Sequence, residues 1–369
     1  MAISDLFSDE KVNTGRQVEL DIAKAFAIIF MVFLHTIMVV KAYSPGLSPA
    51  YDFIFGNVLG RPYAAVIFMF CMGVGAVYSR HSQWGTMVER GVTLYLSGIL
   101  VNVFEFFVPH FLAEALGIDP TPFTIEGGLL LFCVDILAFA GMAFVLMGIL
   151  KKFKFSNKKL IIVAVSLSII GSLLRFTDFG NPDINLICGH FFGTKFTAFP
   201  LFNWFIFPIA GYIWGQYFIR AKDKREFFKF WPILMVISLI YFFVSSNLWG
   251  GVFSENVHFY YFLNTLDAVF CIINAHAVIG LCYWMVKYLP DAIIKTCSIL
   301  SSNINKIYIA QWFFIPVTIV LIESFAKGLV LNDLITAVIS IVMLIISTAV
   351  ALLYKKLRAS INQSRKALI

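Results

Sequence analysis

The residues best suited to do chemistry lie near the start of the chain, in the apolar stretch 18–40. Asp21 and Lys24 are three residues apart, so they can pair on one helix face. Lys24 and His35 are eleven residues apart, almost three helical turns, which places both on one stripe with a rise of about 16 Å between them. Ionisable groups inside an apolar span are costly to bury and are candidates for function. The pattern predicts a helix with a cation near one membrane face and an imidazole toward the other.

A neutral histidine in such a position can act as a general base. It would accept a proton from a hydroxyl or amine while that group attacks a carbonyl carbon. A carboxylate on the second ring nitrogen would fix the tautomer and stabilise the imidazolium. Glu105 and Asp267 are the candidate carboxylates because both are predicted at the depth of His35. The alternative for His35 is a structural histidine that is buried in the bundle and bonded to a carbonyl group.

Apolar segments long enough to cross a bilayer must position these groups. The 369 residues are 60% hydrophobic and 13% charged and include 40 phenylalanines, which excludes a soluble globule, a disordered chain and a nucleic-acid-binding domain. A membrane helix needs about 20 mainly apolar residues. Ten segments qualify: about 18–40, 62–78, 88–108, 127–150, 160–174, 201–219, 230–247, 263–286, 307–325 and 333–354. We therefore predict an all-α fold, a polytopic membrane bundle of about ten transmembrane helices that forms one domain over residues 1–369.

The distribution of basic residues orients this bundle. With the N-terminus inside, 23 of the 28 Lys and Arg residues fall on the cytoplasmic side, as the positive-inside rule requires. The exceptions are Lys41, Arg61, Arg175, Lys195 and Lys327. We therefore expect both termini to be cytoplasmic, and we interpret the net charge of +7 mainly as an orientation signal.

Several other site types have no support in the sequence. The six cysteines form no CxxC pair and are interpreted as small hydrophobic residues, so no disulfide framework is expected. No metal-ligand cluster, Walker loop or dinucleotide motif is present, and we expect no metal and no nucleic-acid partner.

Residues 20–27 (Leu-Asp-Ile-Ala-Lys-Ala-Phe-Ala), followed by His35, resemble the opening signature of the membrane-bound acyltransferase-3 family. In that family an acidic residue and then an arginine begin the first helix, and a histidine follows eleven residues after the arginine. Here Lys24 takes the place of the arginine, which removes its bidentate geometry. The expected ten-helix architecture agrees with the family.

Three further stretches are similar to this family or to the related heparan-glucosaminide acetyltransferase-like proteins. They are residues 68–75, 199–211 and 301–312. In many relatives a histidine lies near the position of Gln311, and the region around Arg90 carries a second arginine. This chain has neither of these residues.

The resemblance implies transfer of an acyl group, commonly acetyl, from cytoplasmic acyl-CoA to a hydroxyl or amine on the other side of the membrane. The acceptor it implies is a glycan or a related small molecule, as in polysaccharide modification, and the expected location is the inner membrane of a bacterial cell. Lys24, Arg80 and Arg90 lie on the cytoplasmic side, where they could meet the CoA phosphates. Membrane orientation alone, or snorkelling of Lys24, is the alternative explanation for these cations.

Three residues toward the outer side are candidates for binding the acceptor. Glu126 lies at the outer mouth of segment 127–150, and Arg175 ends segment 160–174 and could pair with a buried carboxylate. Trp204 is one of several aromatic residues that could stack on a sugar ring, the alternative being an interfacial aromatic belt.

A second class of function competes with acyl transfer. The same buried charges could form the proton or substrate path of a transporter or flippase for a small polar or lipid-linked solute. The spacing in segment 18–40 and the lack of a visible internal repeat favour the acyltransferase. The lipid bilayer is an expected partner in both cases, and association into a homo-oligomer stays open.

Overall fold

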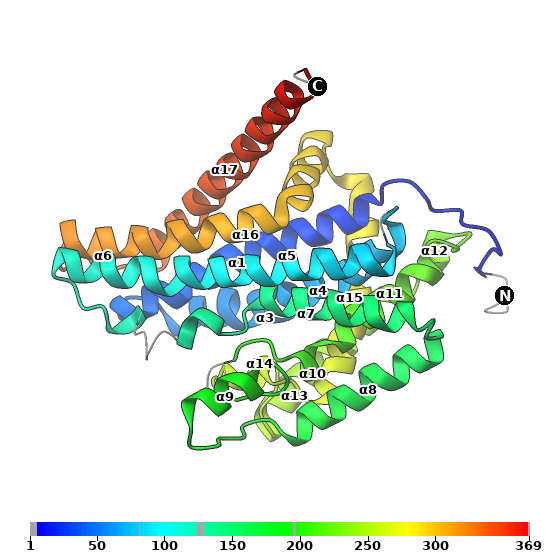
Figure 1. Cartoon of the computed structure of the whole chain (residues 1–369), viewed down its shortest axis with the longest axis horizontal. Coiled ribbons are helices and arrows are strands. Elements are labelled where there is room, and N and C mark those ends of the chain that lie inside the picture. Colours follow the sequence, from blue (N-terminus) through cyan, green and yellow to red (C-terminus); the bar gives the residue numbers. More distant parts are fainter. Residues whose placement is uncertain (1–5, 81, 124–128, 195–196, 368–369) are drawn as a thin grey trace.

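Helices make up 77% of the computed structural model, which describes residues 6–80, 82–123, 129–194 and 197–367. Within those ranges there is no β-strand, and only two isolated bridges join Phe7 to Ala221 and Val134 to Thr197. The predicted all-α fold is confirmed. Figure 1 shows the long helices running roughly along one axis, with α17 rising away from the others toward its C-terminal end.

The first half of the chain contains both long helices and short π-helical or 3-10 segments. Its elements are α1 (Val18–Tyr43), α2 (Pro49–Tyr51), the π-helix η2 (Asp52–Gly60), α3 (Arg61–Tyr63), α4 (Ala65–Tyr78), α5 (Trp84–Asn102), the π-helix η3 (Val103–Phe107), α6 (Val108–Leu116), the 3-10 turns η4 (Thr121–Phe123) and η5 (Leu129–Phe132), α7 (Ile136–Lys152) and α8 (Asn157–Leu173).

The second half ends in the two longest helices. Its elements are α9 (Pro182–Gly189), α10 (Leu201–Trp204), α11 (Ile206–Phe218), α12 (Lys224–Phe227), α13 (Trp231–Leu248), α14 (His258–Tyr261), α15 (Thr265–Met285), the 3-10 turn η6 (Val286–Tyr288), α16 (Asp291–Phe325) and α17 (Asp333–Ala367).

Seven helical segments among the described residues are long and apolar enough to cross a membrane, so the chain is a multi-pass membrane protein. They are Val18–Tyr43, Pro49–Tyr78, Trp84–Leu116, Lys224–Leu248, Thr265–Tyr288, Asp291–Phe325 and Asp333–Ile361. The other three predicted spans correspond to α7, α8 and α10 with α11. α7 and α8 have 17 residues each and α11 has 13, less than the 20 or so that a span needs. The predicted total of ten stays a prediction.

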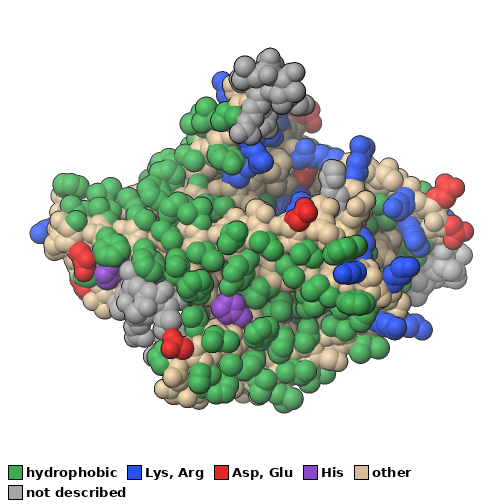
Figure 2. Space-filling model, viewed as in Figure 1, with side chains coloured by type: hydrophobic (Ala, Val, Ile, Leu, Met, Phe, Trp, Pro, Cys, Tyr) green, Lys and Arg blue, Asp and Glu red, His purple; other side chains and the backbone are tan. Residues whose placement is uncertain are grey.

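Helix α1 occupies the centre of the bundle because it packs against α16 on one side and contacts η2, α4, α15 and α17 on others. Its buried face includes Ile22, Ile28 and Val32, which have no exposed surface. The outer surface of the bundle is also apolar: Leu173 and Phe325 are 78% and 80% exposed. Hydrophobic side chains cover the middle of the face in Figure 2, whereas Lys and Arg gather at one end and beside α17. This arrangement matches a bundle surrounded by lipid.

Two glycines explain how α4 and α11 approach each other. A Cβ atom on Gly73 would overlap the carbonyl oxygen of Pro208, and one on Gly211 would overlap the carbonyl oxygen of Phe70. Close backbone approach through small residues is a common way for membrane helices to associate. Stretches 68–75 and 199–211 therefore form the two sides of one helix crossing.

We predict that Gly211→Ala destabilises the protein, because the added methyl group meets backbone that cannot move aside. The expected loss is about 1–3 kcal/mol, seen as a lower melting temperature of the detergent-solubilised protein. Gly75→Ala on α4 is the matched control, since a Cβ there meets nothing within 4 Å. Equal melting temperatures for the two variants would contradict this account of the crossing.

Candidate active site

His35 lies in the part of α1 that faces α16, and three residues of α16 surround its ring. Its Nδ1 is 3.1 Å from Nε2 of Gln311. The ring stacks on Trp312 with the centroids 4.2 Å apart, and the ring of Tyr308 approaches edge-on at 5.7 Å. Tyr308, Gln311 and Trp312 lie within five residues of one another, so a single turn of α16 fixes the imidazole.

The partner of His35 is thus a neutral amide, not the carboxylate that the sequence predicts. An amide can turn its N–H or its C=O toward Nδ1, so Gln311 suits either neutral tautomer of the imidazole. As placed, Nε2 of Gln311 faces Nδ1, and Oε1 is buried without a hydrogen-bond partner, so a flip of the amide would bring Oε1 to the ring. When that oxygen accepts from Nδ1–H, Nε2 of His35 carries the free lone pair that a general base needs.

Asp135 ties α7 to the same site. It is the N-cap of α7, where Oδ1 accepts from the backbone N–H of Ala138 at 2.8 Å and Oδ2 accepts from the hydroxyl of Tyr308 at 3.2 Å. The segment before it is held by Asn102 of α5, whose Nδ2 donates to the carbonyls of Leu131 and Cys133, both at 2.8 Å. Three helices are therefore connected by hydrogen bonds beside His35.

Glu105 completes this site from a π-helical segment, η3. It lines the same small cavity, of about 60 Å³, as His35 and Asp135. π-Helical turns interrupt regular helices at functional sites more often than elsewhere. The structure thus brings together two of the three predicted catalytic residues, His35 and Glu105.

A larger groove of about 650 Å³ opens on the basic side of this cavity. Its charged lining consists of one cation from each of four helices: Lys24 of α1, Arg90 of α5, Lys306 of α16 and Arg358 of α17. Lys24 is 3.3 Å from Asp21, which confirms the predicted pair on one helix face. Ser301 of α16 donates to Asp21 at 2.6 Å, and Arg16 also contacts that carboxylate. Figure 2 shows basic side chains around the hollow beside α17.

A second groove, of about 580 Å³, lies on the other side of His35. It shares Leu34, Met38, Tyr260 and Tyr261 with the histidine cavity. The basic groove shares no lining residue with that cavity, but the two linings lie within about one helical turn of each other on α4, α7 and α16. His35 therefore lies between two openings, one whose charged residues are all basic and one that carries both acidic and basic residues.

Asp267 is not brought to His35. It lies in the first turn of α15, fully buried, where Oδ1 accepts from the hydroxyl of Tyr241 at 2.8 Å and its backbone N–H donates to Asn264. Neither groove nor the histidine cavity includes it. Asp267 therefore lies in a different part of the bundle from His35, although the sequence predicts the same depth for both.

The other predicted residues that the structure describes also lie outside these cavities. Trp204 has no exposed surface, and its indole N–H donates to the carbonyl of Tyr261 at 2.7 Å. The ring has no open face in this structure, and its stacking on a sugar stays a prediction. Arg175 lies over the rings of Phe176 and Phe259. Arg80 is exposed in the turn after α4, beyond the lining of the basic groove, and Glu126 lies outside the described residues.

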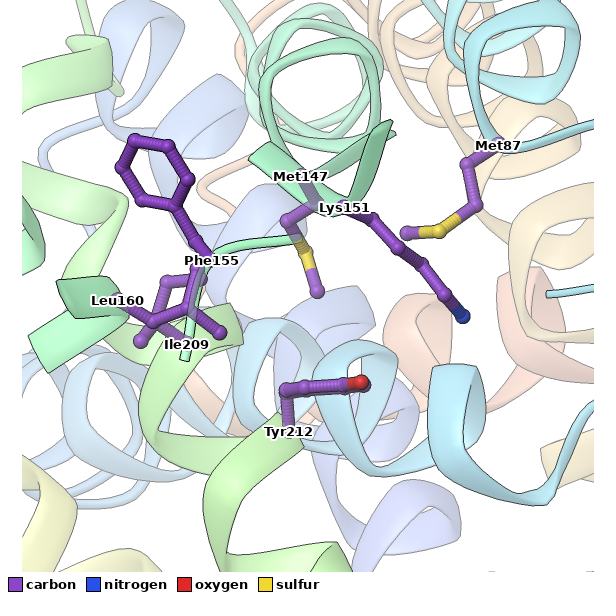
Figure 3. Close-up of a pocket in the computed structure, with 7 residues that line it drawn as sticks. All are labelled: Met87, Met147, Lys151, Phe155, Leu160, Ile209 and Tyr212. Carbon is purple, nitrogen blue, oxygen red and sulfur yellow. The ribbon is translucent and has the colours of Figure 1, made fainter. Parts of the chain in front are cut away.

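A further small cavity has no comparable chemistry. Figure 3 shows Lys151 and six largely apolar neighbours around a space of about 40 Å³. The ammonium group of Lys151 points away from Phe155 and donates to the carbonyl of Ser82 at 2.5 Å. In the described part of the chain there is also no group of three His, Cys, Asp or Glu that could hold a metal ion.

The acyltransferase-3 family model, described as an acyltransferase domain, matches residues 17–355. The chain belongs to the acyltransferase-3 family. The matched range includes His35, Glu105 and three cations of the basic groove, Lys24, Arg90 and Lys306. The fourth cation, Arg358, lies just beyond the end of the matched range. No curated protein and no solved structure matches the chain.

We predict that Asp135→Ala destabilises this acyltransferase by about 0.5–2 kcal/mol, the usual loss for an N-cap carboxylate. The backbone N–H of Ala138 and the hydroxyl of Tyr308 both lose their acceptor. The matched control is Ser156→Ala, because Ser156 caps α8 without a side-chain hydrogen bond. The melting temperature should fall for the first variant only, and a similar fall for both would refute the anchoring role of Asp135.

Proposed function

We propose that this protein transfers an acyl group, commonly acetyl, from acyl-CoA to a hydroxyl or amine of a glycan or related small acceptor. The acyl-CoA enters through the basic groove and the acceptor through the opposite groove. The observation that carries the proposal is the position of His35, between the two grooves and in contact with a small cavity. Membership of the acyltransferase-3 family supports the reaction class.

The cations of the basic groove fit the phosphates of acyl-CoA. Lys24, Arg90, Lys306 and Arg358 come from four helices and meet at one opening, whereas orientation in the membrane alone would not require them to share a groove. The rise along α1 from Lys24 to His35 is about 16 Å, much of which an extended pantetheine arm would cover. The phosphates would stay at the basic end while the thioester reaches the cavity.

The proposed reaction uses His35 as the general base. Nε2 takes the proton from the acceptor hydroxyl or amine as its oxygen or nitrogen attacks the thioester carbonyl. A bond from the acceptor to the carbonyl carbon forms, the C–S bond breaks, and the proton passes from His35 to the leaving thiolate to give free CoA. Gln311 orients the ring but carries no charge, so Glu105 is the residue we propose to offset the imidazolium.

The membrane arrangement that fits this reaction has the basic end in the cytoplasm. Both termini would then be cytoplasmic, as the positive-inside distribution predicts. About ten spans in one domain over residues 1–369, in the inner membrane of a bacterial cell, complete the proposal. In that orientation acyl-CoA and the extracytoplasmic acceptor approach His35 from opposite faces.

We predict that His35→Ala lowers turnover about 10²–10⁴-fold, the usual contribution of a general base. The measurement is the release of CoA thiol by purified protein supplied with acetyl-CoA and an acceptor sugar. His110→Ala is the control, because His110 contacts Glu114 on α6 and lies outside the cavity. Near-normal turnover in a folded His35→Ala variant would exclude this base. Solute uptake into liposomes without thiol release from any acyl-CoA would favour a transporter.

The basic groove gives a separate prediction. Arg90→Ala and Lys306→Ala should each raise the KM for acetyl-CoA about tenfold, since each removes a charge-assisted contact, while kcat changes little. Lys158→Ala, an exposed cation on the same side of the bundle, should leave KM unchanged. A KM that responds equally to all three variants would mean that general surface charge, and not this groove, attracts the substrate.

A further inference from the structure

Arg61 is a buried cation on the side of the bundle where the sequence has few basic residues. It begins α3, is 6% exposed and lines the groove opposite the basic one. Its Nη1 donates to the carbonyl of Val252 at 3.1 Å and also to that of Ser254. Its own carbonyl accepts from the hydroxyl of Tyr260 at 2.6 Å. The guanidinium is therefore held in a fixed place by the loop before α14.

No carboxylate in the described part of the chain lies within 4.0 Å of this guanidinium, and its Nε is buried without a hydrogen-bond partner. Of the charges that line the same groove, Asp52 is paired with Lys41 at 2.7 Å. Glu255 is exposed. A buried cation normally has a bonded counter-charge, because leaving it unpaired is costly. Arg61 is thus a pre-oriented cation whose bonds to the protein are to neutral carbonyls, and no described carboxylate balances its charge.

We propose that Arg61 binds an oxyanion, a carboxylate or phosphate, on the acceptor. The planar fork of arginine suits both groups and can hold either one through two parallel hydrogen bonds. This would make an acidic sugar, or a sugar carried on a phosphate, the preferred acceptor class. The proposal rests on the proposed function only in naming the ligand an acceptor, since binding of the anion requires no reaction.

The position of Arg61 also fits a role in orienting the acceptor. The groove that it lines shares Leu34, Met38, Tyr260 and Tyr261 with the cavity of His35. Tyr260 connects the two because it lines both and bonds the backbone of Arg61. An acceptor anchored by its anionic group at Arg61 would have its other groups directed along this aromatic wall toward His35.

The test is a binding measurement on the purified full-length protein without acyl-CoA. The melting temperature is followed as a function of sugar concentration, which gives an apparent Kd for each probe. Methyl β-D-glucuronide carries a carboxylate, glucose 6-phosphate carries a phosphate, and methyl β-D-glucoside is the neutral counterpart. Ionic strength is matched with sodium chloride in all samples. We expect at least one anionic probe to bind about tenfold or more tightly than the neutral one, and the better of the two identifies the source of the oxyanion.

Two variants assign that preference to Arg61. Arg61→Gln should bind anionic and neutral sugars equally, and Arg61→Lys, which keeps the charge and lacks the fork, should lose most of the preference. Because Arg61 also holds a loop, Arg61→Lys decides the matter if Arg61→Gln does not fold. Lys327→Gln, an exposed cation outside the groove, should retain the preference. Equal binding of all three sugars by the natural protein, or an unchanged preference in either Arg61 variant, would overturn the proposal. Neither result depends on whether the protein releases CoA thiol.

Discussion

The contact between α1 and α16 is the interaction on which the rest of the site depends. At one end Asp21 accepts from Ser301 and pairs with Lys24 and Arg16, and further along His35 meets the Gln311 and Trp312 side chains. Lipid offers no partner to such groups, so two long apolar helices can carry them only by satisfying each other's polar atoms. Because one helix pair holds both a cation of the basic groove and the histidine, the distance and direction between them are fixed by the rigidity of the helices.

The proposed transfer of an acyl group between two sides of a membrane must meet two requirements at once. The reacting atoms must meet, yet an open channel through the bundle would let ions and water pass. The two large grooves approach His35 from opposite sides, and only the groove that Arg61 lines shares residues with its cavity. The basic groove is separated from the cavity of His35 by about one helical turn of α4, α7 and α16. Substrates can therefore approach one cavity while packed side chains such as Ile28, which has no exposed surface, keep the interior closed.

The sequence predicts the parts of this site that depend on spacing within one helix. The interval between Lys24 and His35 and the pair formed by Asp21 and Lys24 follow from helical geometry alone. In the structure Lys24 pairs with Asp21 and lines the basic groove, and His35 lines the small cavity. Contacts between helices are different. Gln311 and His35 are separated by 276 residues, and no periodicity connects them. Depth alone made Asp267 as good a candidate as Glu105, but depth does not say which helices are neighbours. Lys306 and Arg358 were missed because basic residues at helix ends also serve as orientation signals. The burial of Trp204 could not be predicted either, because aromatic composition does not tell which rings line a groove and which pack behind it.

A structure of the complex with a non-hydrolysable acyl-CoA analogue, determined by electron cryo-microscopy in a lipid nanodisc, tests the central claim most directly. The account predicts density for the phosphates among Lys24, Arg90, Lys306 and Arg358, with the acyl carbonyl beside His35 in the cavity that Glu105 lines. Phosphates bound instead in the groove that Arg61 lines, or a thioester held on the far side of α1 from His35, would contradict it.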